Sequence, residues 1–317
     1  MERVIVAALS GVSIILIMVA LGYLMNERKW FSSESPRIIS RLVTQVALPA
    51  YMVATVTKRF TASELRQLLP DLRYPVLSMT ILFALAAAIA RICAVRKNHR
   101  GLFTSMFFNS NTVFIGLPLN MALFGSASVP YVLVYYMANT TFFWTLGVWL
   151  IQHDGKHKAG VNWRQVVSKI FSPPLLGFIL AVILIILHIH VPAFIMQTCG
   201  YLGGLTVPLS MLFIGIAISN AGLCRLRFDR DAVLIMLGRF VVAPLLMILL
   251  VMPASMPLLM KQVFVIQAAM PVMTNAPIVA KLYQADADYA AVMVTETTLM
   301  AAVTVPLWMV VVQMVVK

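Results

Sequence analysis

Polar and helix-breaking residues stand in the middle of one long apolar segment of the chain. The stretch 109–118 reads Asn-Ser-Asn-Thr-Val-Phe-Ile-Gly-Leu-Pro, and its candidate ligand residues are Asn109, Asn111, Thr112, Gly116 and Pro118. In lipid, irregular backbone occurs only where it is buried in protein or lines a water-filled cavity, because unsatisfied polar groups are costly there. An unwound helix exposes backbone amides, and the N-terminus of the half-helix that follows carries a partial positive charge. This stretch therefore predicts a binding site suited to an anion.

A second segment has the same character. Residues 270–277 read Met-Pro-Val-Met-Thr-Asn-Ala-Pro, with candidate ligand residues Pro271, Thr274, Asn275 and Pro277. A proline inside a helix removes an amide hydrogen and costs about 3 kcal/mol or more, so we expect both segments to kink or unwind. Two broken helices in corresponding positions point to a transporter's substrate site near the bilayer midplane. The alternative is that the prolines only bend their helices, as they often do in membranes.

The elements that must position these groups are transmembrane helices. Of the 317 residues, 61% are hydrophobic and 11% are charged, with a mean hydropathy of +0.93, whereas soluble domains carry about a quarter charged residues. A spanning helix needs about 20 apolar residues. Runs of this kind occur at 4–25, 38–57, 72–95, 102–123, 128–152, 173–191, 197–220, 232–252, 259–283 and 288–316. The sequence predicts an all-α polytopic membrane protein with ten transmembrane helices, the first too long to be the core of a signal peptide.

A hydrophilic segment after the fifth run leaves five spans on each side. An odd number per half means that two halves of one fold would enter the membrane in opposite directions. An offset of 159 residues places Pro49 on Pro208 and Pro118 on Pro277, although no other proline finds a proline partner. We therefore expect two inverted five-helix repeats, with the domains 1–152 for the first repeat, 153–172 for a cytoplasmic linker and 173–317 for the second repeat.

The distribution of lysine and arginine predicts the orientation of the chain. Loops after odd-numbered spans carry 14 of these residues, and the opposite side, with both termini, carries 7. Because cytoplasmic loops are enriched in lysine and arginine, both termini are expected outside the cytoplasm. We expect a multi-pass protein of the cell (cytoplasmic or inner) membrane.

Three polar residues inside the apolar spans are further candidates. Glu296 lies well inside the last span, where we expect it either to couple transport to a proton near neutral pH or to hold the helices together through hydrogen bonds. Arg239 either extends toward the membrane surface or acts as a counter-ion of the substrate or a partner of Glu296. Asn139, in the fifth span, is expected to steady the fourth span or to line the same cavity.

Several classes of protein are disfavoured. The net charge of +13 lies in short loops, without basic stripes interleaved with aromatic residues, so we expect no nucleic-acid partner. The three cysteines show no metal-ligand spacing, and no hydrolase or metalloprotease motif occurs. We expect no metal, no cofactor and no catalysis. A membrane-embedded ligand sensor, which needs the same pocket but moves nothing, is the alternative to a transporter.

The two broken segments resemble those of the auxin efflux carrier family, whose bacterial members include malonate and malate permeases. The shared features are the Asn-rich fourth span ending in Gly-Leu-Pro, the Pro-x-x-Thr-Asn-Ala-Pro of the ninth span, and the Ala-Lys-Leu-Tyr that leads to a Thr-rich tenth span. The likeness runs over nearly the whole chain, and these two segments are its specific part.

The resemblance implies a fold similar to the bile-acid/sodium symporters and sodium/proton antiporters. Spans 1, 2, 6 and 7 would form a scaffold that makes a homodimer, and spans 3–5 and 8–10 a moving transport core in which the fourth and ninth helices cross. It assigns Asn111 and Pro118 to one crossing segment and Asn275 and Pro277 to the other. It implies a small organic anion, a carboxylate or dicarboxylate, as the substrate, and we expect transport by alternating access. Because the sequence shows no obvious paired-acid sodium site, we expect proton coupling or uniport in preference to sodium symport, with Na⁺ left open because carbonyl and hydroxyl oxygens are able to bind it.

Overall fold

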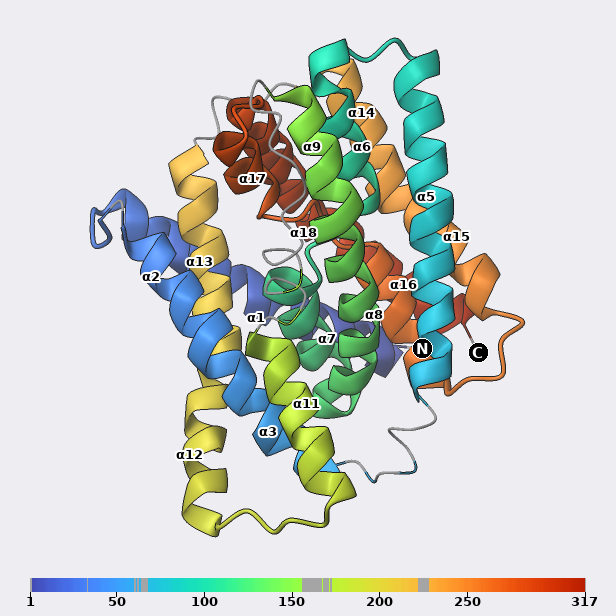
Figure 1. Cartoon of the computed structure of the whole chain (residues 1–317). Helices are drawn as coiled ribbons and strands as arrows, with labels where there is room; N and C mark the ends of the chain where they lie inside the picture. The colour runs from blue at the N-terminus through green and yellow to red at the C-terminus, as the bar shows by residue number, and fades with distance from the viewer. Residues whose placement is uncertain are drawn as a thin grey trace.

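The computed structural model describes residues 2–32, 34–59, 61, 63, 68–155, 167, 171, 173–221 and 228–316. Over these residues the chain is helical and built from apolar helices, as expected for a polytopic membrane protein (Figure 1). Most of the predicted linker, 153–172, lies outside the described residues.

The first half of the chain contains the helices α1 (Glu2–Glu27), α2 (Ser35–Leu42), α3 (Leu48–Arg59), α5 (Arg73–Ile92), α6 (Arg100–Phe108), α7 (Leu117–Phe124), α8 (Val129–Phe142) and α9 (Val148–Asp154). The second half contains α11 (Pro173–Ile186), α12 (Ala193–Gly204), α13 (Thr206–Ala221), α14 (Arg230–Leu237), α15 (Ala243–Val251), α16 (Leu258–Ala268), α17 (Ala276–Leu282) and α18 (Ala287–Val315). Wider, π-helical turns join some of them end to end: η1 (Val43–Ala47), η4 (Thr112–Gly116), η6 (Phe143–Gly147) and η8 (Gly238–Val242).

Fewer helices than the ten expected are long enough to cross a bilayer. Among the described residues five helices pass by length and composition, or six if the two parts of the bent α18 count as one span. One reason is that two of the expected spans are interrupted, so α6, α16 and α17 are each too short alone. Another is that one continuous helical stretch, Thr112–Asp154, includes parts of the fourth and fifth expected spans. The bend in α18 lies four residues before Pro306, where proline clashes with the preceding turn. The ten-helix inverted repeat stays a prediction.

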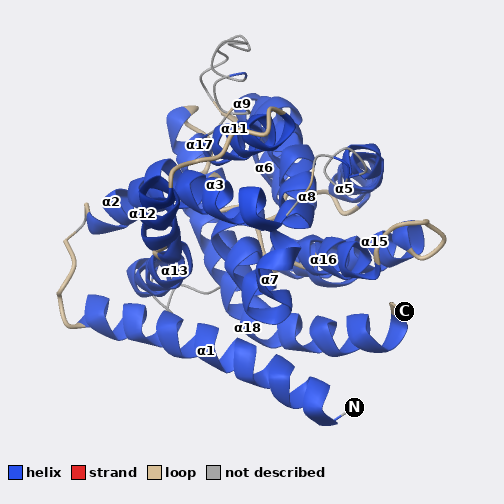
Figure 2. Cartoon of the chain, turned by 90° about the horizontal axis from the view of Figure 1, so that it is seen from below, coloured by secondary structure: helices blue, strands red, loops and turns tan. Residues whose placement is uncertain are grey.

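The helices form two groups in space. In Figure 1, α2, α3, α11, α12 and α13 gather on one side, and α5, α14, α15 and α16 on the other. Figure 2 shows α1 as a long helix along α13 and α18. Glycines of the first group allow close backbone contacts: a Cβ at Gly215 of α13 would overlap α1, and one at Gly177 of α11 would overlap Pro49 of α3. Small residues at helix contacts are the usual means of close packing in membranes.

Both polar segments interrupt their helices. Helix α6 ends at Phe108, and η4 begins at Thr112; α16 ends at Ala268, and α17 begins at Ala276. The unwinding precedes Pro118 and Pro277 instead of occurring at them. Pro277 lies in the first turn of α17, where a missing amide hydrogen breaks no helical hydrogen bond. Pro118 lies where the wide turn η4 passes into α7. Both predicted segments are therefore broken. Within each segment the break lies before Pro118 or Pro277, near Asn109 and Asn111 in the first and near Pro271 in the second.

Candidate functional site

The two breaks bind each other through their backbones. Ser110 and Val272 form an antiparallel bridge, and the amide of Asn111 donates to the carbonyl of Pro271 at 2.8 Å. The amide of Val272 donates to the hydroxyl of Thr297 on α18 at 3.2 Å. Backbone groups that the breaks remove from helices thus find partners within the protein, as lipid requires.

Asn139 of α8 completes the first break. Its side-chain amide donates to the carbonyl of Ser110 at 2.8 Å, and its side-chain oxygen accepts from the amide of Ser110 at 2.9 Å. The fully buried Asn139 therefore pairs with Ser110 as a neighbouring strand would. This is the steadying role expected from the sequence.

Arg239 of η8 binds the ends of both first half-helices. It is fully buried, and its guanidinium donates to the carbonyls of Phe107, Met270 and Ala268. It therefore does not extend toward the membrane surface. Glu296 is also fully buried, one residue from Thr297; a pairing of Glu296 with Arg239 stays a prediction.

A cleft of about 410 Å³ opens beside the breaks. One wall comes from α2, η1 and the start of α11, and the other from η4, α8, η6 and the second break. The described residues that line it are uncharged, and they are Ser40, Thr44, Gln45, Asn111, Thr112, Val113, Phe114, Tyr136, Thr140, Trp144, Pro173, Pro174, Met273, Thr274, Asn275, Ile278 and Val279.

Two buried polar groups at this cleft have no hydrogen-bond partner among the described residues. The side-chain oxygen of Asn111 accepts from the amide of Phe114 at 3.1 Å and so caps η4, which fixes the side-chain amide nitrogen as the unsatisfied group. The hydroxyl of Thr140 is the other. Both side chains are 2% exposed. Buried polar groups are nearly always paired, so two unsatisfied donors at one cleft mark a place for an acceptor.

The π-helical turns coincide with the site. Thr44 and Gln45 lie in η1, Thr112 in η4 and Trp144 in η6, and all of them line the cleft, while Arg239 lies in η8. Wide turns of this kind occur frequently at functional sites because they redirect side chains from the regular helix.

The predicted site residues separate into two sets. Those that line the cleft are Asn111, Thr112, Thr274 and Asn275, and those that are not among its lining residues are Asn109, Gly116, Pro118, Asn139, Pro271, Pro277, Arg239 and Glu296. Asn109 donates to the carbonyl of Ser105 in its own helix. A Cβ at Gly116 would overlap the side chain of Gln267, which donates to the carbonyl of Thr112 at 3.2 Å. Within the second set, Asn139, Arg239 and Pro271 make hydrogen bonds that hold the breaks.

Sequence reasoning missed most of the wall opposite the breaks. Ser40, Thr44 and Gln45 recur with helical spacing in an otherwise apolar span, a signal that was available. Trp144 gave no such signal, because an aromatic residue in a membrane span is most simply read as packing.

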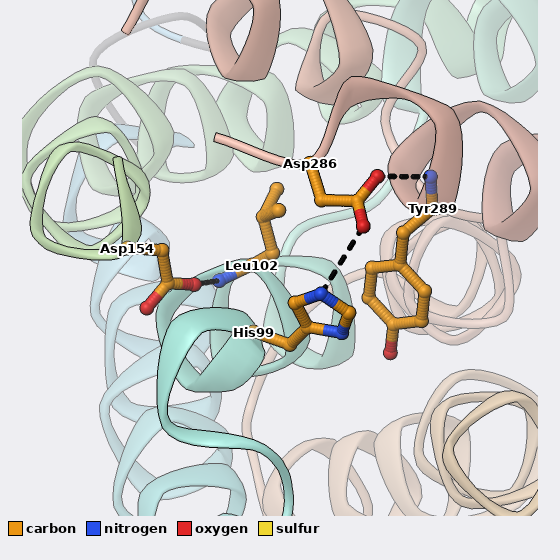
Figure 3. Close-up of polar contacts among 5 residues, drawn as sticks. All are labelled: His99, Leu102, Asp154, Asp286 and Tyr289. Carbon is orange, nitrogen blue, oxygen red and sulfur yellow. Dashed lines mark hydrogen bonds and ion pairs between the residues drawn. The ribbon is translucent and has the colours of Figure 1, made fainter. Parts of the chain in front are cut away.

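A polar cluster, the His99 cluster, connects the ends of α6, α9 and α18 (Figure 3). His99, at the start of α6, pairs with Asp286 at 3.1 Å and stacks on Tyr289. Asp286 also caps α18 by accepting from the amide of Tyr289 at 2.9 Å. Asp154 of α9 accepts from the amide of Leu102 at 2.6 Å. These contacts fix α6, α9 and α18 to one another at a distance from the breaks.

Comparison with known proteins decides the family. Residues 7–309 match the family described as membrane transport protein. The chain belongs to this family. Membership over nearly the whole length confirms the resemblance to auxin efflux carriers, and it shows a transport role in place of catalysis.

Two relatives of this chain are also named as transporters. It is 29% identical over 309 residues to an uncharacterised transporter of Methanothermobacter thermautotrophicus, with 94% of this chain and 96% of the relative covered. It is 25% identical over 305 residues to an uncharacterised transporter of Methanocaldococcus jannaschii, with 94% of this chain and 96% of the relative covered. The similarity therefore extends across both breaks and every helix that lines the cleft.

Proposed function

We propose that this transporter moves a small organic anion across the membrane by alternating access, and that the anion binds in the cleft beside the two breaks. The observation that carries the proposal is the pair of unsatisfied donors, the side-chain amide of Asn111 and the hydroxyl of Thr140. Asn111 also caps the half-helix formed by η4 and α7, whose N-terminal amides favour negative charge.

The chemistry of the cleft favours one carboxylate attached to an apolar body. Asn111 and Thr140 both line the cleft, and the described lining adds Phe114, Trp144 and Ile278 without a charged side chain. A second carboxylate would lose its hydration without gaining a cation, which is unfavourable in a buried site. A dicarboxylate is the runner-up, and it would require a charge from outside the described lining.

The position of the cleft suggests how transport occurs. One wall comes from α2 and α11 of the first helix group together with η1, and the other comes from the breaks, α8 and η6. A displacement of the first group against the breaks would therefore change access to the bound anion. In this proposal the group with α3, α11 and α12 is the scaffold, through which two copies pair, and the breaks travel with the core. The crossing of inverted repeats and the extracytoplasmic termini belong to the same proposal.

Proton coupling is assigned to Glu296 in this proposal. The residue is buried one position from Thr297, whose hydroxyl binds the second break, so a change in its charge would act close to the site. Glu296→Gln should transport at a rate that no longer varies with pH between about 5 and 8. An unchanged rate and pH profile would remove this role.

Binding and flux are measured separately. A thermal-shift screen of monocarboxylates and dicarboxylates at two pH values, with and without Na⁺, identifies ligands because a ligand of the folded state raises its stability. Counterflow of the best radiolabelled ligand in proteoliposomes then tests transport. Ligand binding without flux would establish a sensor, and no binding by any carboxylate would contradict the anion proposal.

A further inference from the structure

The guanidinium of Arg239 connects the two interrupted helices by binding carbonyls at the start of both breaks. It donates through Nε to the carbonyl of Met270 at 3.1 Å, through Nη1 to that of Phe107 at 3.1 Å, and through Nη2 to that of Ala268. Phe107 lies in the last turn of α6, and Ala268 is the last residue of α16. One side chain from a third helix therefore serves both interrupted helices.

These carbonyls form a negatively polarised site. The last carbonyls of a helix have no partner within the helix, and the helix dipole gives this end a partial negative charge. Two such ends meet here at a fully buried position. Without a cation at this point, the paired C-termini would repel each other in a medium that screens charge poorly.

The neighbouring sequence brings the guanidinium to this position. Arg239 lies in the wide turn η8, and a Cβ on the preceding Gly238 would overlap the ring of Phe107. Glycine thus allows η8 to approach the residue whose carbonyl Arg239 binds. The planar guanidinium, with five donors in fixed directions, can bind three carbonyls together.

We propose that Arg239 is a positioning residue that acts as the resident cation of the two breaks. Its guanidinium supplies, between three converging carbonyls, the positive charge that a bound metal ion would otherwise have to provide, so the substrate site is assembled without Na⁺. This inference concerns how the breaks are held and does not depend on which anion is carried.

Chemical rescue tests the inference on the purified full-length protein. Arg239→Ala should lower the midpoint of thermal unfolding by about 10 °C, given a loss of several buried hydrogen bonds. Addition of about 10 mM guanidinium should restore about 3 °C or more of that loss, while the same concentration of urea, a neutral molecule of the same shape, restores none. Arg91→Ala, which removes an exposed arginine bonded to the carbonyl of Ala87, is the matched control and should not respond.

Two further measurements keep the test decisive if Arg239→Ala does not fold. Arg239→Lys keeps the charge and should be more stable than Arg239→Met, which keeps only the length. The wild-type midpoint should be equal in Na⁺ and in choline at matched ionic strength. Equal stability of the Lys and Met variants, rescue by urea as well as guanidinium, or a specific stabilisation of the wild type by Na⁺ would each overturn the inference.

Discussion

The amide of Asn111 donates to the carbonyl of Pro271 at 2.8 Å, which joins the breaks of two helices from opposite halves of the chain. The same residue caps η4 with its side-chain oxygen, lines the cleft, and has a buried side-chain nitrogen with no hydrogen-bond partner among the described residues. Asn111 thus has two roles: it holds the two breaks together, and in our proposal it donates a hydrogen bond to the anion. Substitutions can separate the two roles.

Asn111→Ser separates the cap from the amide donor. Serine is also a good N-cap, so we expect the free energy of unfolding to stay within about 1 kcal/mol of the wild type. Loss of the side-chain nitrogen should weaken anion binding about 10-fold or more, because a hydrogen bond to a charged group contributes about 1.5–3 kcal/mol. Isothermal titration and thermal unfolding measure the two effects.

Asn111→Ala is the companion to that variant. It removes both the cap and the donor, so it should lose about 1 kcal/mol of stability more than Asn111→Ser at a similar loss of binding. Equal affinity of the wild type and both variants would place the anion elsewhere.

Asn139→Leu should destabilise the protein strongly. It leaves the amide and carbonyl of Ser110 without their partner in a fully buried place, at about 1–3 kcal/mol for each group. Asn120→Leu is the matched control, since Asn120 is equally buried and donates to one carbonyl, that of Gly116. Thermal unfolding should show that Asn139→Leu lowers the free energy of unfolding by about 2 kcal/mol more than Asn120→Leu does. Equal losses in the two variants would mean that the pairing with Ser110 contributes no stability.

Gly238→Ala should move Arg239 away from its carbonyls. A methyl group at this position overlaps the ring of Phe107, and overpacking of this kind costs about 1–3 kcal/mol. Gly200→Ala meets no atom within 4 Å, and it should be neutral or slightly stabilising because alanine favours helix. A Gly238→Ala protein that unfolds at the wild-type temperature would contradict the close approach of η8 to α6.

Variants of Asp286 test the His99 cluster. Asp286→Asn retains an N-cap for α18 and loses the charge that faces His99, whereas Asp286→Ala loses both. We expect Asp286→Ala to lose about 1–2 kcal/mol of stability and Asp286→Asn about half of that. Hydrogen exchange should be faster in residues 97–102 and 286–290 of the alanine variant, and exchange spread evenly over the chain would argue against a local role.

Part of this architecture could be predicted from the sequence because it depends on local chemistry. Asparagine and proline inside an apolar run disfavour helix wherever they occur, so the breaks near Asn111 and Pro271 could be located without the structure. The steadying role of Asn139 followed from its place in an otherwise apolar span.

The remainder depends on contacts between distant segments. Periodicity places Arg239 inside a span but does not show which carbonyls face it, and the interpretations offered from the sequence were the membrane surface or another charge. The contributions of Thr44 and Trp144 to the two walls were missed for the same reason, because helix packing decides which faces meet at a cleft.

Counterflow in proteoliposomes tests the central claim most directly. Vesicles that contain the wild-type protein and are loaded with the monocarboxylate that stabilises it most should accumulate the radiolabelled compound transiently. Asn111→Ser should reconstitute equally and show counterflow at less than about a tenth of the wild-type rate at low substrate concentration. Equal counterflow by both proteins, or none by a wild-type protein that binds the compound, would contradict the proposal that this transporter carries an organic anion at the two breaks.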